Sequence, residues 1–172
     1  MFLLKTVSPQ EATGQLANIY AAFPREIGLP KPLELVSASP PMLEKQIAAI
    51  AYYRSHKRLS PPLLAAIRYL AAEKSGHPFC IDFNAGLLLR MGLTAKDLAG
   101  LKADPKNSNL DEDETAMLAF VAKALSTPES VTSQDIEALR AQGFDDTDIY
   151  DAMAHGAQIM AGAVLYKTFY RE

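Results

Sequence analysis

The residues best suited to chemistry lie around Cys80, the only cysteine of the chain. Pro78 lacks an N–H group and has a fixed φ near the helical value, so the sequence predicts a helix that starts there, with His77 just before it. Cys80 is then the third helical residue, where the helix dipole and unpaired N–H groups favour an anion. We therefore expect its thiol pKa to lie below the ~8.5 of a free cysteine. The alternative is a buried, inert cysteine.

Polar residues on both sides of Cys80 are candidates for helping it. His77, Cys80 and Asn84 are spaced i, i+3 and i+7, so they share one helix face or its mouth. His77 is a candidate general base, with a helix cap or a surface histidine as the alternative. Tyr69 and Glu73, on the preceding helix, are candidates for a proton donor or acceptor near the same pocket. The alternative for them is a tyrosine at a helix interface and a solvated glutamate.

Other polar clusters predict no further site. His77 and Cys80 have the spacing of two metal ligands, but a structural zinc needs four ligands, so we expect no metal here. The acidic run 111–114 is typical of favourable charge at a helix start. His56 and His155 are interpreted as structural or solvated.

The elements that position these residues are all predicted to be helices. Caps, prolines and apolar spacing indicate helices at about 8–23, 33–36, 39–54, 60–74, 79–91, 94–101, 111–125, 132–143 and 146–170. Residues 85–89 are almost continuously apolar, so we expect the 79–91 helix to be central. Gly156 and Gly162 are expected to allow close helix approach. No strand pattern is present.

Length and composition indicate one globular domain covering residues 1–172. Hydrophobic residues make up 49% of the chain and charged residues 22%, which is ordinary globular usage. The net charge of −3, with scattered Lys and Arg, predicts no nucleic-acid partner. No apolar run is long enough for a membrane span or a signal peptide, and a single cysteine excludes an internal disulfide. We expect a cytoplasmic protein.

The segment 59–93 resembles the core motif of the alkylhydroperoxidase D and carboxymuconolactone decarboxylase superfamily. That motif is a helix opening with Leu-Ser-Pro, a small loop, and Cys-x-x-Cys-x-x-x-His opening a second helix. Three further stretches are similar to the peroxidase-related branch of the superfamily, and with them the resemblance covers nearly the whole chain: 11–20, 39–42 and 131–144.

The resemblance implies an all-α helical bundle that forms closed homo-oligomers. In thiol-peroxidase members the second cysteine of the motif attacks the hydroperoxide, and that position is Cys80. The resolving cysteine is replaced by His77, the motif histidine by Asn84, and the relay glutamate by Ala65, so the motif is degenerate. The position before the attacking cysteine, often aromatic or histidine, is Phe79, a further candidate pocket residue.

Three functions remain open. The first is a weak, one-cysteine thiol-dependent hydroperoxide reductase in which Cys80 is the nucleophile and an external thiol is the reductant. The second is an acid–base enzyme of the decarboxylase or lyase type, in which His77 acts on a small molecule. The third is a non-catalytic helical oligomer that keeps the pocket for binding. None of the three requires a cofactor.

Overall fold

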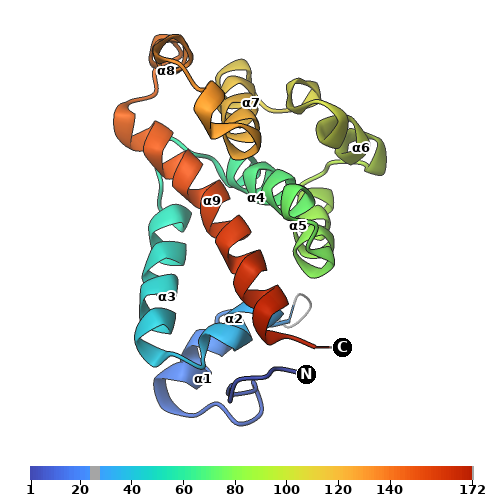
Figure 1. Ribbon diagram of the computed structural model, residues 1–172, viewed down its shortest axis with the longest axis vertical. Coiled ribbons are helices and arrows are strands. Elements are labelled where there is room, and N and C mark those ends of the chain that lie inside the picture. The colour runs from blue at the N-terminus through green and yellow to red at the C-terminus, as the bar shows by residue number, and fades with distance from the viewer. Residues whose placement is uncertain (24–27, 172) are drawn as a thin grey trace. The chain divides into compact units, whose positions relative to one another are not determined.

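The computed structural model describes residues 1–23 and 28–171, and its regular elements are helices, as predicted (Figure 1). An isolated antiparallel bridge joins Phe2 to Tyr170. In the described part no helix is both long and apolar enough to cross a membrane. The α-helices and 3₁₀ turns are α1 (Gly14–Ala21), α2 (Lys31–Val36), α3 (Pro40–Arg54), α4 (Pro61–Ser75), α5 (Pro78–Arg90), α6 (Ala95–Ala103), η1 (Pro105–Asn107), α7 (Glu112–Ser126), η2 (Pro128–Ser130), α8 (Ser133–Ala141) and α9 (Asp146–Phe169).

The chain divides into two compact units. One consists of Met1–Ser55 with Gly162–Glu172, and the other of His56–Ala161. The helix α9 begins in the second unit and ends in the first. The candidate site residues all belong to the second unit.

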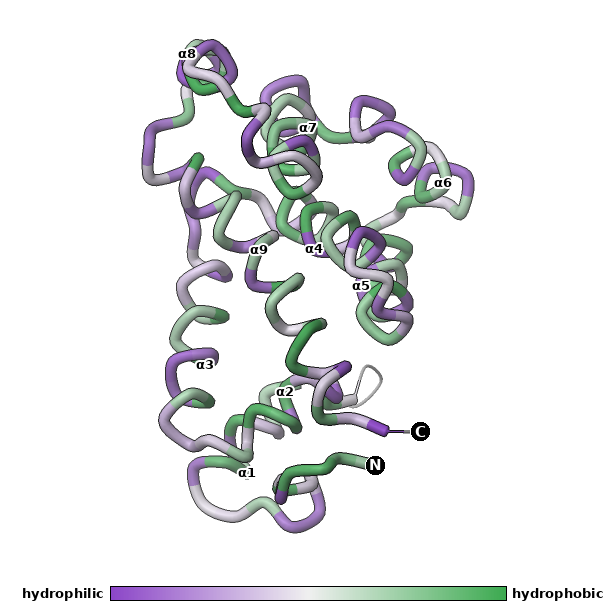
Figure 2. The backbone as a smooth tube through the Cα atoms, viewed as in Figure 1, coloured by the Kyte–Doolittle hydropathy of each residue, from purple (hydrophilic) through white to green (hydrophobic). Residues whose placement is uncertain are grey.

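Helix α4 is the buried centre of the His56–Ala161 unit. The Ser60 hydroxyl accepts a hydrogen bond from the Leu63 amide at its start, and Gly76 ends it in the left-handed conformation, with φ 57° and ψ 45°. Eight of its residues are buried, and it packs against α5 and α7. Hydrophobic colouring runs along most of α4 in Figure 2.

Helix α5 is not central, so that prediction is wrong. Only Asn84 and Leu88 are buried on it, and Leu89 is 46% exposed. The reason is that α4 buries apolar side chains around nearly its whole circumference, which leaves α5 as a covering helix.

Close approach of α9 to its neighbours depends on Gly156, as predicted. A Cβ atom added there would lie 3.0 Å from Leu125 Cδ1, 3.1 Å from Val121 Cγ1 and 3.3 Å from Ile67 Cγ2. At Gly162 an added Cβ meets no heavy atom of the described residues within 4 Å. The predicted role of Gly162 is therefore wrong.

The first helix begins later than predicted, at Gly14 rather than near Ser8. The Ser8 amide and hydroxyl both donate to the Glu11 carboxylate, as in a capping box, but the segment forms only a turn. Gly14 has a φ of 56°, which interrupts a continuous right-handed helix. The other helices agree with the prediction to within about two residues, the usual uncertainty of helix ends.

Aromatic packing joins the ends of the chain within the first unit. The rings of Phe2 and Tyr170 meet edge to face with centroids 5.4 Å apart, and Tyr166 stacks on Tyr170 at 4.7 Å. The Leu3 amide donates to the Phe169 carbonyl at 2.8 Å.

Candidate functional site

Cys80 lies in the first turn of α5, as predicted. Pro78 is the first helical residue, and His77 is the N-cap. The His77 Nδ1 atom accepts a hydrogen bond from the Cys80 amide at 3.2 Å. This bond satisfies one of the N–H groups that a helix start leaves unpaired, and it fixes the backbone that carries the thiol.

The thiol of Cys80 does not have the lowered pKa that its position predicts. Its residue is partly buried, and burial raises the pKa of the thiol to about 11. The dipole of a helix end favours the thiolate, but loss of hydration disfavours it more strongly here. Because the Cys80 amide already donates to His77, it is also engaged when the thiol ionises. At neutral pH the thiol is therefore almost entirely protonated.

Asn84 is 3% exposed and links the first turn of α5 to α4. Its Nδ2 group donates to the Cys80 carbonyl at 2.8 Å, and its Oδ1 atom accepts from Arg68 Nε at 3.0 Å. The side chain thus holds the backbone of Cys80 from the carboxyl side, as His77 does from the amide side. Both residues position the cysteine.

Arg68 is the residue of this cluster that sequence reasoning missed. It lies on α4 and also contacts α9, where Nη1 is 3.0 Å from His155 Nε2. Burial lowers the pKa of the guanidinium to about 10, so it remains charged at neutral pH. The sequence did contain a signal for this residue, because Arg68 is the one charged residue in the apolar run 63–72. A helix that is apolar on so many sides is buried, and a charged residue on it is then buried as well.

His155 is buried and neutral at physiological pH. Burial and the neighbouring Arg68 charge lower the pKa of its imidazole to about 3. The ring donates to the Leu64 carbonyl, so the Nε2 atom carries the lone pair that accepts from Arg68. The sequence left a structural and a solvated role open for His155, and its burial agrees with the first.

The proposed proton donors, Tyr69 and Glu73, interact with each other and with α6. Tyr69 is buried, and burial together with its contact to Glu73 raises the pKa of the phenol to about 12. Glu73 also forms an ion pair with Lys102 at 2.8 Å. Phe79 stacks on Phe83 with ring centroids 6.0 Å apart. For Tyr69 this matches the alternative of a tyrosine at a helix interface, whereas Glu73 is ion-paired rather than simply solvated.

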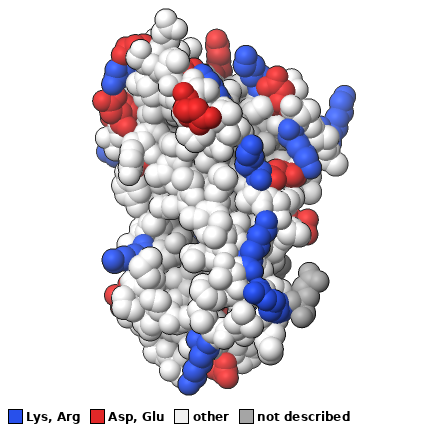
Figure 3. All heavy atoms as spheres, in the orientation of Figure 1, with Lys and Arg blue, Asp and Glu red and all other residues white. Residues whose placement is uncertain are grey.

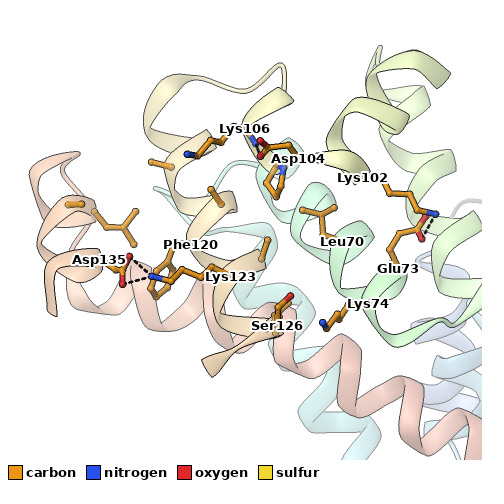
Figure 4. A pocket seen from close by; sticks show the side chains of 17 residues that line it. Leu70, Glu73, Lys74, Lys102, Asp104, Lys106, Phe120, Lys123, Ser126 and Asp135 are labelled. Carbon is orange, nitrogen blue, oxygen red and sulfur yellow. Dashed lines mark hydrogen bonds and ion pairs between the residues drawn. The ribbon is translucent and has the colours of Figure 1, made fainter. Parts of the chain in front are cut away.

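A groove of about 820 Å³ lies on another side of α4, between α6, α7 and α8 (Figure 4). Figure 4 shows the Glu73–Lys102 pair at one end and the Lys123–Asp135 pair, 2.7 Å apart, at the other. Cys80 is not among its lining residues. Within residues 1–23 and 28–171, no group of three or more His, Cys, Asp and Glu side chains is arranged to hold a metal ion.

Comparison with known proteins identifies the fold. No family model and no curated protein matches the chain. Among solved structures, an uncharacterized peroxidase-related protein from Silicibacter sp. TM1040 superposes with a TM-score of 0.75 at 17% identity, over 98% of this chain and 92% of that one. A second, described as an alkylhydroperoxidase AhpD core from Ralstonia eutropha JMP134, gives a TM-score of 0.69 at 19% identity, over 87% and 86% of the two chains.

Proposed function

We propose that this chain, which has the alkylhydroperoxidase D-like fold, is a slow one-cysteine thiol peroxidase that uses an external thiol. The observation that carries the proposal is the placement of Cys80. It is partly exposed, it lies in the first turn of α5, and both its amide and its carbonyl are held by side chains. The similarity of the fold to proteins described as peroxidase-related supports the same chemistry.

The reaction needs only the thiol, a hydroperoxide and two molecules of external thiol. The Cys80 thiolate attacks one peroxide oxygen, the O–O bond breaks, and an alcohol or water leaves while Cys80 becomes a sulfenic acid. One external thiol then displaces water to form a mixed disulfide, and a second releases Cys80 as a thiolate. Because the chain has no second cysteine, it cannot form an internal disulfide.

Three features of the site keep this reaction slow. The thiol pKa of about 11 leaves little thiolate at neutral pH. His77 and Asn84 have their polar atoms directed at the backbone of Cys80. The position of the relay glutamate is occupied by Ala65, a fully buried residue that has no carboxylate to carry protons.

The direct test is peroxide consumption in the presence of a monothiol reductant, with the wild type beside Cys80→Ser. We expect slow turnover that disappears in the serine variant and loss of activity over repeated cycles as Cys80 is over-oxidised. Equal rates for the two proteins would refute the proposal. The serine variant keeps the size of the side chain, so a folding defect is not expected.

A non-catalytic oligomeric binding protein is the second candidate. It is favoured by the same hydrogen bonds, since His77 and Asn84 stabilise the helix start without needing any reaction. An acid–base enzyme that uses His77 requires its imidazole to face a substrate, whereas Nδ1 serves as the helix cap. Turnover dependent on Cys80 separates the peroxidase from both alternatives.

A further inference from the structure

Arg68 is a cation that the His56–Ala161 unit holds without an acidic partner. Its neighbours along α4 are buried, including Ala65, Ile67 and Tyr69. Among the described residues its guanidinium contacts are the Asn84 amide oxygen and the His155 ring nitrogen, both of them neutral. Burying a charge is unfavourable unless an opposite charge compensates it.

Several other cations of the same unit are paired with carboxylates. Arg58 contacts Asp113 at 2.9 Å, and Lys123 contacts Asp135 at 2.7 Å. These pairs lie near the surface, where hydration already compensates the charges. The unit therefore pairs carboxylates with these partly exposed cations. Arg68, which is more deeply buried, has no carboxylate partner among the described residues.

We propose that Arg68 binds the carboxylate group of a small organic anion. A guanidinium has five N–H donors, and Asn84 and His155 take one on Nε and one on Nη1. The second N–H of Nη1 and the two of Nη2 remain. Arg68 as a residue is partly exposed, and none of its guanidinium nitrogens is both fully enclosed and without a hydrogen-bond partner.

The two neutral partners also fix the plane of the guanidinium. One of them lies on α5 and the other on α9, so the fork is held from two sides before a ligand arrives. A carboxylate matches the remaining Nη1 and Nη2 donors with two parallel hydrogen bonds. Such preorganisation strengthens binding because little side-chain freedom is lost.

The charge of the surroundings favours a monoanion. Of the three side chains that contact one another here, Arg68 carries the charge, because Asn84 has no ionisable group and His155 is neutral at physiological pH. A carboxylate neutralises this charge, whereas the dianion that makes up a large part of inorganic phosphate at neutral pH would leave a negative charge uncompensated. We therefore expect carboxylates to bind in preference to inorganic phosphate.

The test is a titration with benzoate, its neutral analogue benzamide, and inorganic phosphate, followed by calorimetry and by the NMR signal of the Arg68 Nε–H group. We expect saturable binding of benzoate, at least about tenfold tighter than that of benzamide or phosphate, since charge-assisted bidentate pairs are roughly twice as strong as neutral bonds. The titration is repeated on Cys80→Ser. Benzoate binding by this variant is expected to be unchanged. The test of the carboxylate site is therefore independent of the test of the peroxidase proposal.

Three variants assign the binding to Arg68. Arg68→Met keeps much of the length of the side chain and should weaken benzoate binding at least about tenfold. Arg68→Lys keeps the positive charge but lacks the two parallel donors of a guanidinium, so its benzoate affinity should lie between those of the wild type and Arg68→Met. Arg90→Met, on the exposed end of α5, is the matched control and should bind as the wild type does. Circular dichroism and urea unfolding show which variants are folded.

Three results would overturn the proposal, the first two for binding at Arg68 and the third for the carboxylate as its ligand. The first is the absence of saturable benzoate binding to the wild type, together with an Arg68 Nε–H signal that does not move. The second is binding by a folded Arg68→Met or Arg68→Lys variant that equals that of Arg90→Met. If phosphate binds more tightly than benzoate, the assignment to a carboxylate is wrong.

Discussion

At the scale of single residues, the reactivity of Cys80 is decided by two opposing effects of its location. The helix start favours the thiolate, and burial favours the neutral thiol. Burial prevails and raises the pKa of the thiol to about 11. The folded state therefore holds Cys80 as a weak nucleophile at neutral pH, and its contribution to stability is lost as pH rises from about 8.5, the unfolded value, toward 11.

The alkylation of Cys80 by iodoacetamide should show this directly. In the folded protein at pH 7 the rate should be at least about tenfold below that of the urea-unfolded chain, because a smaller fraction of the thiol is ionised. It should then rise roughly tenfold per pH unit toward pH 11. A midpoint at or below about 8.5 would show that the helix end, and not burial, controls the thiol.

At the scale of elements, α4, α5 and α9 are joined by hydrogen bonds that pass through Arg68. Asn84 on α5 and His155 on α9 contact the same guanidinium. The imidazole of His155 stays neutral because burial and the Arg68 charge lower its pKa to about 3. Protonation of His155 is therefore coupled to the packing of α9 on α4.

This coupling predicts a pH dependence of stability. Below pH 6.5 the unfolded chain binds a proton at His155 that the folded chain does not bind until about pH 3, so acid favours unfolding across this window. Urea unfolding at pH 7 and pH 4.5 should show a larger loss of stability for the wild type than for His155→Gln, which cannot titrate. Equal losses would mean that His155 is protonated without strain in the folded state.

The close packing of α9 gives a second prediction at this scale. Gly156→Ala should lower the free energy of unfolding by about 1–3 kcal/mol, because its Cβ would overlap Leu125 and Val121. Gly162→Ala, on the same helix, should instead raise it by about 0.5–1 kcal/mol through better helix propensity. Urea unfolding of the two variants measures both. A neutral or stabilising Gly156→Ala would contradict the packing described here.

The helices could be predicted from the sequence because their ends are local features. Thr94 and Thr132 each form a capping box with the aspartate three residues later, and no distant residue is needed to recognise one. The cluster around Cys80 could be predicted only in part. The bonds from Arg68 to Asn84 and His155 span 16 and 87 positions, and burial, which sets the thiol pKa, depends on the packing of other helices.

At the scale of the whole molecule, α9 presents an uncharged surface that we expect to mediate self-association. Residues 152–166 contain no Asp, Glu, Lys or Arg. Val164 is 65% exposed and Leu165 52% exposed. Figure 3 shows that Lys, Arg, Asp and Glu side chains are densest over the upper part of this face, where Figure 1 has α6, α7 and α8, and that further Lys and Arg side chains lie over its lower part.

Sedimentation at micromolar concentration should find an oligomer. The double variant Val164→Glu with Leu165→Glu should shift it toward monomer, because each substitution buries a charge at an apolar contact. Gln134→Glu, at an exposed position on α8 and outside residues 152–166, is the control and should leave the assembly intact. A wild type that is monomeric, or a double variant that assembles normally, would count against this surface.

The central claim, that Cys80 is a slow peroxidatic thiol, is tested most directly by the rate at which peroxide oxidises it as a function of pH. Intact-mass spectrometry after exposure to hydrogen peroxide follows the addition of one oxygen to the wild type, with Cys80→Ser as the blank. We predict sulfenic acid formation that is slow at pH 7 and rises about tenfold per pH unit up to pH 9, because the thiolate fraction does so below a pKa of about 11. A folded protein whose Cys80 gains no oxygen at either pH, or one already oxidised at its maximal rate at pH 7, would contradict the claim.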